Sequence, residues 1–249
     1  MNKQIYRLSA KFYDELNAGE LQFLSESLAN YFSEKKISEG SNILDLGCGT
    51  GTLLGKLSNY GFCGTGIDVA PEMVKEAKRK YPSLNFKVMD LCSFELEEKF
   101  DVILCTNDVI NYLEPNAKED FFTQISKHLN LEGICYIDFD TETDMSCCWQ
   151  GQKSVKKGQG WEVTRSSFYD KEVCIGTEIQ DWVINKNGKT YNFNEVHKLH
   201  PLSSSDVCKL VKNVSMQIRN FVEPTEFCMV NKSLDSYLRL GCILNKVPR

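Results

Sequence analysis

The chain has 249 residues, of which 42% are hydrophobic and 25% are charged, the balance of an ordinary soluble globular protein. This length predicts one large domain or one domain with an insertion. The formal net charge of -5 argues against the broad basic surface that nucleic acids and anionic membranes require. We therefore expect no nucleic acid and no membrane among the partners.

The sequence carries no recognisable targeting signal. Its first residues mix charges with apolar side chains, unlike a secretory signal, and no apolar run approaches the 18 residues of a membrane span. Eleven cysteines are present, an odd number without any C-x-x-C spacing. Cysteines in apolar runs, such as Cys105 and Cys135, fit buried thiols in a reducing compartment better than a disulfide or metal framework. The sequence predicts a cytoplasmic protein without a metal site, and it assigns no role to the adjacent Cys147 and Cys148.

The first half of the chain alternates between helical and strand-like patterns. Residues 11–35 repeat apolar side chains at helical spacing and are expected to form a helix. Short apolar runs follow, with helical segments between them. Strands that alternate with helices predict a doubly wound, mostly parallel sheet with helices on both faces. The expected strands are residues 42–46, 64–67, 86–89, 100–105 and 133–139, and two of the helices between them are residues 71–80 and 117–129.

The pattern changes near residue 141. Residues 161–200 have a strand-like composition, and Asn187-Gly188 between two strand-like runs is a strong signal for a hairpin turn. A helix at 204–212 and strand-like runs at 216–221 and 237–245 follow. We predict an α/β fold with a mostly parallel, seven-stranded Rossmann-like sheet and a small antiparallel β lid inserted after strand five. The expected parts are N-terminal helices with a cofactor-binding core (1–140), a substrate lid (141–201) and a C-terminal helix with the last strands of the core sheet (202–249).

The most informative motif is a glycine-rich turn after the first expected strand. It begins with Asp45 and continues with glycines at alternate positions, Gly47, Gly49 and Gly51. Glycines there allow a sharp turn and a close approach of the backbone to a ligand, although dinucleotide and mononucleotide sites share such turns. Asp68 and Asp90 end the second and third expected strands. Their carboxylates are placed to bind the hydroxyls of a ribose and the amino group of an adenine, respectively.

This combination resembles the class I S-adenosylmethionine-dependent methyltransferases over residues 40–140. The glycine spacing differs from the G-x-G-x-x-G of nicotinamide-dependent enzymes, because position 52 is a threonine. The resemblance implies S-adenosylmethionine as the cofactor, with its methionine part beside the glycine-rich turn, its ribose on Asp68 and its adenine edge on Asp90. The cofactor-binding residues that it implies are Asp45, Gly47, Cys48, Gly49, Thr50, Gly51, Asp68, Val69, Met73, Asp90, Leu91 and Asn107.

The rest of the chain resembles the small-molecule branch of this family, which includes glycine and aminosugar N-methyltransferases with an antiparallel insertion after strand five. In that branch an N-terminal segment covers the cofactor, which implies a place for Tyr13 near the reactive sulfur. The loop after the fourth strand, which includes Tyr112, is implied to face the methyl group and the substrate. This loop lacks the Asn/Asp-Pro-Pro-Tyr signature of the enzymes that methylate adenine or glutamine amides.

A two-residue turn at Asn187-Gly188 also fixes which hairpin residues face each other. Trp182 then pairs with Phe193, and Glu178 pairs with His197, on one side of the ribbon. That side mixes aromatic, acidic and imidazole groups, whereas the other side is mostly aliphatic. We expect the mixed side to cover the substrate, where His197 orients a nucleophile or accepts its proton, and Glu178 fixes the histidine tautomer or pairs with a cationic amine. The alternative is an exposed side with an ordinary cross-strand pair.

No residue of the chain is a committed nucleophile, which fits a mechanism of positioning. We predict in-line methyl transfer to a small molecule, with nitrogen slightly ahead of oxygen as the acceptor and Tyr13, Tyr112, His197 and Glu178 around the reacting atoms. The alternatives are a methyltransferase that acts on a protein or an RNA, a non-catalytic S-adenosylmethionine-binding module, and a nicotinamide-dependent oxidoreductase. The protein is expected to be a monomer or a homodimer.

Overall fold

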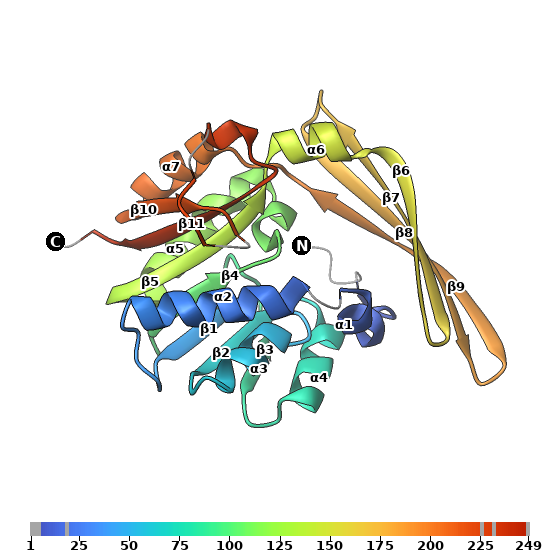
Figure 1. Cartoon of the computed structure of the whole chain (residues 1–249), viewed down its shortest axis with the longest axis horizontal. Helices are drawn as coiled ribbons and strands as arrows, with labels where there is room; N and C mark the ends of the chain where they lie inside the picture. Colours follow the sequence, from blue (N-terminus) through green and yellow to red (C-terminus); the bar gives the residue numbers. More distant parts are fainter. Residues whose placement is uncertain (1–5, 18–19, 225–226, 231–232, 248–249) are drawn as a thin grey trace.

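The strand-forming runs of the sequence build two separate sheets in a computed structural model, which describes residues 6–17, 20–224, 227–230 and 233–247 (Figure 1). Within these residues, one sheet has seven strands in the order β10-β11-β5-β4-β1-β2-β3 and the other has four in the order β6-β7-β8-β9. The strands of the first sheet are β1 (Asn42–Leu46), β2 (Cys63–Asp68), β3 (Asn85–Val88), β4 (Phe100–Cys105), β5 (Leu129–Asp140), β10 (Met216–Val222) and β11 (Arg239–Lys246). Those of the second are β6 (Gln150–Gly158), β7 (Trp161–Asp170), β8 (Ile175–Lys186) and β9 (Lys189–Leu199).

The seven-stranded sheet is mostly parallel. Strands β1 to β5 pair parallel to one another, whereas β11 runs antiparallel to both β5 and β10. The central strands β1 and β4 are almost wholly buried, as expected of parallel strands covered on both faces. The predicted seven-stranded sheet with an antiparallel insertion after its fifth strand is confirmed.

Helices cover both faces of this sheet. Apolar side chains of α5 (Lys118–His128) and α7 (Ser204–Lys212) pack into the core on one face, and those of α2 (Glu20–Glu34), α3 (Thr52–Ser58) and α4 (Pro71–Lys80) pack on the other. The expected helix at 11–35 is instead a short 3-10 helix, η1 (Ala10–Phe12), followed by α1 (Tyr13–Leu16) and α2, and residues 18–19 lie outside the described residues. The remaining helices are α6 (Glu142–Cys148) and the 3-10 turns η2 (Val109–Tyr112), η3 (Pro115–Ala117) and η4 (Leu234–Ser236). None of the helices in the described part of the chain has the length and apolar character needed to cross a membrane.

The four-stranded sheet, β6 to β9, is called the lid sheet below. Its β8–β9 register is the predicted one, with Trp182 opposite Phe193 and Glu178 opposite His197. The mixed side faces inward: Trp182 and His197 are each 1% exposed, whereas Val183 on the other side is 37% exposed. The mixed side is therefore the buried one, which excludes the alternative of an exposed side.

The N-terminal segment, residues 6–17, lies between the two sheets (Figure 1). Its Leu16 packs against Trp161 and Trp182 of the lid sheet. The carboxylate of Asp14 accepts hydrogen bonds from Thr50 Oγ1 at 2.5 Å and Thr52 Oγ1 at 2.9 Å, at the start of α3. The segment thus connects the lid sheet to the glycine-rich turn.

Other carboxylates hold the segment to the lid sheet. Glu195 of β9 accepts hydrogen bonds from Ser9 Oγ at 2.7 Å and from the backbone N–H of Tyr6 at 3.0 Å. Glu15 accepts one from Trp161 Nε1 at 2.7 Å. Because the segment is bound both by the lid sheet and by the glycine-rich turn with the start of α3, its position depends on how these two parts sit relative to each other.

Two glycines of the turn provide a matched test of its packing. Gly49 and Gly51 both have positive φ, 51° and 74°, so alanine at either costs about 1–2 kcal/mol in backbone strain. A Cβ at position 51 would lie 2.7 Å from Phe86 Cζ, whereas one at position 49 meets nothing within 4 Å. We expect Gly51→Ala to lower the free energy of unfolding by about 1–3 kcal/mol more than Gly49→Ala, as measured by urea denaturation of the ligand-free protein. Equal losses would contradict the packing role of Gly51.

Candidate active site

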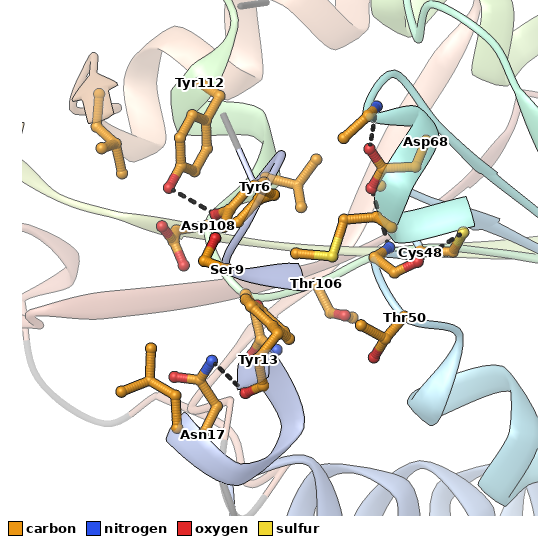
Figure 2. A pocket seen from close by; sticks show the side chains of 18 of the residues that line it. Tyr6, Ser9, Tyr13, Asn17, Cys48, Thr50, Asp68, Thr106, Asp108 and Tyr112 are labelled. Carbon is orange, nitrogen blue, oxygen red and sulfur yellow. Dashed lines mark hydrogen bonds between the residues drawn. The ribbon is translucent and has the colours of Figure 1, made fainter. Parts of the chain in front are cut away.

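A cavity of about 310 Å³ opens at the carboxyl ends of the parallel strands. The glycine-rich turn and the ends of β1, β2, β4 and β5 form one wall, and the N-terminal segment and the lid sheet form the others. Carboxyl ends of strands at a reversal of strand order are the usual binding place in sheets of this type. In Figure 2, Asp68, Cys48 and Thr50 lie on one side of the cavity and Tyr6, Tyr112 and Asp108 on the other. We call these sides the turn end and the tyrosine end.

Most of the residues that the sequence nominates come together in this cavity. Its lining includes Tyr13, Asp45, Gly47, Cys48, Gly49, Thr50, Asp68, Val69, Met73, Asn107, Tyr112 and Glu178. The other nominated residues, Gly51, Asp90, Leu91 and His197, lie outside the lining.

Each residue outside the lining has a local reason for its position. Gly51 packs against Phe86, and Leu91 is buried in the core of the sheet. The carboxylate of Asp90 accepts a hydrogen bond from the backbone N–H of Cys92 at 2.9 Å, which closes a turn. His197 lies directly behind Tyr112. The cavity therefore offers no support for placing Asp90 and Leu91 on the cofactor.

Asp68 organises the turn end. Its Oδ2 accepts a hydrogen bond from the backbone N–H of Gly49 at 2.9 Å, and its Oδ1 accepts one from that of Ala70 at 2.8 Å. The end of β2 is thereby tied both to the glycine-rich turn and to the start of α4. Burial raises the pKa of this carboxyl, and the backbone donors of Ala70 and Gly49 act in the opposite direction.

Asp45 is a buried carboxylate with an incomplete set of partners. Its side chain is 2% exposed, and among the described residues none donates a hydrogen bond to its Oδ2. Burial raises its pKa to about 7, and the neighbouring charge of Asp68 adds to the effect. Since Asp45 lines the cavity, a cationic ligand group would supply the missing interaction.

A chain of polar side chains runs from the tyrosine end into the lid sheet. The hydroxyls of Tyr6 and Tyr112 lie 3.3 Å apart, and the Tyr112 hydroxyl lies 3.0 Å from Nδ1 of His197. Burial lowers the pKa of His197 to about 4, so its ring is neutral near pH 7. Among the described residues, Nε2 of this ring has no hydrogen-bond partner.

One of the two roles expected of Glu178, fixing the tautomer of His197, has no hydrogen bond to support it, since Tyr112 lies at Nδ1 of that ring and Nε2 has no partner among the described residues. Nη2 of Arg165 lies 2.9 Å from each oxygen of the Glu178 carboxylate. Gln180 Nε2 donates a further hydrogen bond to it at 2.7 Å. The Glu178 carboxylate is therefore already neutralised and held in place by its neighbours.

The turn signal at Asn187-Gly188 pairs β8 with β9 only, so the sequence did not reveal Arg165 of β7 as the partner of Glu178. Arg165 lies on β7, and the connection between β7 and β8, residues 171–174, has no two-residue turn signature. The register of β7 against β8, once known, places Ser167 opposite Glu178 and Arg165 opposite Gln180.

Comparison with known proteins agrees with this geometry. Residues 43–133 match the family model described as a methyltransferase domain. The chain is 26% identical over 223 residues to the putative methyltransferase YqeM of Bacillus subtilis, which covers 86% of this chain and 87% of YqeM. It is 29% identical over 123 residues to the putative methyltransferase 235L of Invertebrate iridescent virus 6, which covers 47% of this chain and 43% of the viral protein.

Residues 43–133 form a methyltransferase domain, and the chain is an S-adenosylmethionine-dependent methyltransferase.

Solved structures share the fold of this methyltransferase along nearly its whole length. An S-adenosylmethionine-dependent methyltransferase from Clostridium acetobutylicum has a TM-score of 0.82 at 20% identity, over 95% of this chain and 97% of the other. The amino pentose methyltransferase CalS10 from Micromonospora echinaspora, solved with S-adenosylmethionine bound, has a TM-score of 0.72 at 16% identity, over 98% and 99%. A malonyl-[acyl-carrier protein] O-methyltransferase of Bacillus anthracis is 29% identical over 174 residues, which covers 67% of this chain and 63% of that protein.

The donor set of the turn end fits S-adenosylmethionine, the cofactor of this methyltransferase. This cofactor has a net positive charge at neutral pH, and the turn end presents the buried carboxylate of Asp45 and the half-buried carboxylate of Asp68. At Gly49 the cavity side of the backbone is open, because a methyl group in place of the glycine hydrogen would meet no atom within 4 Å. The residues present therefore satisfy both the charge and the space that such a ligand needs.

Because one oxygen of Asp45 is unpaired, we expect the folded protein to become more stable when the charge of this side chain is removed. Its raised pKa means that the folded state binds a proton that the unfolded state has lost, so stability decreases between about pH 4 and pH 7. We expect Asp45→Asn to raise the free energy of unfolding of the ligand-free protein at pH 8 by on the order of 1–3 kcal/mol, and by less at pH 5. The measurement is urea denaturation at both pH values.

The matched control is Asp181→Asn on the exposed side of β8. This variant should show no such pH-dependent gain. A loss of stability in Asp45→Asn at pH 8 would refute the assignment of an uncompensated charge to Asp45.

Proposed function

We propose that this methyltransferase acts on a small molecule and methylates an amine nitrogen in preference to a hydroxyl oxygen. The observation that carries the proposal is the position of the N-terminal segment and the lid sheet, which both line the cavity and cover it above the strand ends. The whole cavity of about 310 Å³ includes the turn end, so the part left for the acceptor fits a small molecule better than a segment of protein or RNA.

The charges at the tyrosine end support nitrogen over oxygen. Three carboxylates line it, from Asp108, Asp140 and Glu178, against two guanidinium groups, from Arg165 and Arg239. The excess of negative charge favours a cationic amine. Relatives include both kinds of enzyme, since CalS10 is named an amino pentose methyltransferase and the Bacillus anthracis protein an O-methyltransferase.

The proposed mechanism relies on positioning. S-adenosylmethionine supplies a methyl group activated by a sulfonium. Asp45 and Asp68 would bind this cofactor at the turn end. Tyr13 and Tyr112 would hold the acceptor near the methyl group and exclude water. Efficient transfer requires the acceptor atom in line with the breaking bond at about 3 Å.

Behind this layer, we propose that the neutral His197 fixes the hydroxyl of Tyr112 through its Nδ1. Glu178, held by Arg165, keeps one wall of the tyrosine end polar. In this proposal residues 1–140 bind the cofactor, residues 141–201 close over the acceptor, and residues 202–249 complete the sheet.

Calorimetric titration tests the cofactor assignment. We expect Asp68→Ala to weaken S-adenosylmethionine binding by on the order of 1–3 kcal/mol, because charge-assisted hydrogen bonds to the ribose are lost. NADH serves as the negative control ligand, and a thermal unfolding curve establishes that the variant is folded. Unchanged affinity in a folded variant would remove Asp68 from the cofactor site.

The role of His197 is tested by turnover. We expect His197→Ala to lower kcat by on the order of 10- to 100-fold while the affinity for S-adenosylhomocysteine stays the same, since the Tyr112 hydroxyl loses its anchor. The matched control is His200→Ala, whose ring pairs with the exposed Glu114 at 3.2 Å. Loss of cofactor affinity together with turnover would indicate a structural role for His197.

A further inference from the structure

We propose that Asp108 is the residue that selects a cationic amine as the acceptor and takes its proton before methyl transfer. This inference rests on the proposed function, because it assigns the amine preference to one carboxylate. Asp108 lines the tyrosine end of the cavity beside Tyr6 and Tyr112, as Figure 2 shows.

The backbone around Asp108 is held in an uncommon conformation that fixes its side chain. Asn107 and Asp108 have φ values of 57° and 53°, in the left-handed region that few residues other than glycine adopt. The buried carboxylate of Asp138, 1% exposed, accepts a hydrogen bond from the backbone N–H of Asp108 at 3.0 Å. A buried charge on the adjacent strand β5 therefore stabilises this turn and the placement of Asp108 in the cavity.

The neighbours of Asp108 leave its charge only partly compensated. Arg239 donates from Nη2 to Asp108 Oδ1 at 3.0 Å and from Nε to Asp140 Oδ1 at 2.6 Å, so two carboxylates share one guanidinium. The other cation of the tyrosine end, Arg165, is bound to Glu178. Within the described part of the chain, the carboxylate of Asp108 has no hydrogen bond other than the one from Arg239. One negative charge is left for a ligand to neutralise.

The surroundings also make Asp108 a better proton acceptor than an ordinary aspartate. Burial raises its pKa well above the usual value, the charge of Asp140 raises it further, and Arg239 opposes both effects. The titratable and charged groups that interact with it are Asp138 and Asp140 of β5, Arg239 of β11, Glu178 of the lid sheet, Tyr112 of η2 and Tyr6 of the N-terminal segment. Around these, Arg165 binds Glu178, and Tyr13 lies beside Tyr6. When ionised, a carboxylate of this kind accepts a proton from an ammonium group more readily than a solvent-exposed aspartate does.

In the proposed reaction, proton transfer to Asp108 precedes methyl transfer to the nitrogen. An ammonium group enters beside Asp108 and transfers one proton to the carboxylate, which leaves the nitrogen with a free electron pair. The nitrogen forms its bond to the methyl carbon as the carbon–sulfur bond breaks, and the electron pair of that bond stays on sulfur. The product leaves as a methylated ammonium ion, and the proton on Asp108 passes to solvent. A neutral alcohol brings no charge to complement the carboxylate, so it binds less well.

Binding measurements without turnover provide the test. The enzyme is saturated with S-adenosylhomocysteine and titrated calorimetrically with trans-2-aminocyclohexanol and with trans-1,2-cyclohexanediol, which share a ring and differ in one amine. We expect the wild type to bind the amino alcohol at least 10-fold more tightly than the diol. Asp108→Asn should abolish this difference, Asp108→Glu should restore part of it, and Asp181→Asn on the exposed side of β8 should leave it unchanged.

Three results would overturn the inference. They are equal affinity of the wild type for the two compounds, no measurable binding of the amino alcohol, and an amine preference that survives in a folded Asp108→Asn variant. If the wild type binds S-adenosylhomocysteine in any of these cases, the proposed methyl transfer still stands. Failure to bind S-adenosylhomocysteine would instead overturn the proposed function and this inference with it.

Discussion

The desolvation of carboxylates at the carboxyl edge of the parallel sheet is the constraint on which the site depends. Asp45 and Asp68 lie at the ends of β1 and β2, and Asp138 and Asp140 lie at the end of β5. Burying a charge without partners is costly. Three of these four carboxylates meet a donor or a cation, and Asp45 keeps an unpaired Oδ2. Asp68 takes backbone donors from the glycine-rich turn, Asp138 takes them from the turn at Asn107–Asp108, and Asp140 takes Arg239 of β11. The two turns and the last strand are thus positioned by one electrostatic requirement.

The N-terminal segment and the lid sheet, which cover the cavity, are also held by hydrogen bonds to carboxylates. Asp14 and Glu15 of the N-terminal segment reach to the core and the lid sheet, respectively, and Glu195 of the lid sheet reaches back to the segment. Apolar packing of Phe12 and Leu16 on the lid sheet and of Ala10 on α4 holds the segment together with these hydrogen bonds. Since the contacts come from the lid sheet and from the core beside the glycine-rich turn, a movement of the lid sheet would also move Tyr6 and Tyr13. The tyrosine end is consequently complete only when the seven-stranded core, the N-terminal segment and the lid sheet are together.

Local sequence patterns were enough to predict the strands of the seven-stranded sheet, the glycine-rich turn and the β8–β9 register, because each depends on residues a few positions apart, but they did not predict β6. Local patterns did not predict contacts between residues that are far apart in the sequence. Arg239 and Asp108 are 131 positions apart, and only the antiparallel pairing of β11 with β5 brings them together. Asp90 had the same strand-end pattern as Asp68, yet it closes a turn with Cys92 rather than lining the cavity. A strand-end aspartate thus indicates a position at the sheet edge without indicating which way its side chain points.

The two ends of the cavity stabilise their carboxylates in different ways. This difference determines how much negative charge each end offers to its ligand. At the turn end the donors are neutral backbone N–H groups, which stabilise a negative charge without cancelling it. That end keeps the charge of its carboxylates for a cationic cofactor. At the tyrosine end two arginines cancel most of the charge of three carboxylates, and one negative charge is left. If both ends held their full negative charge, repulsion between them would weaken the folded state, so the arginines allow the second site to lie beside the first.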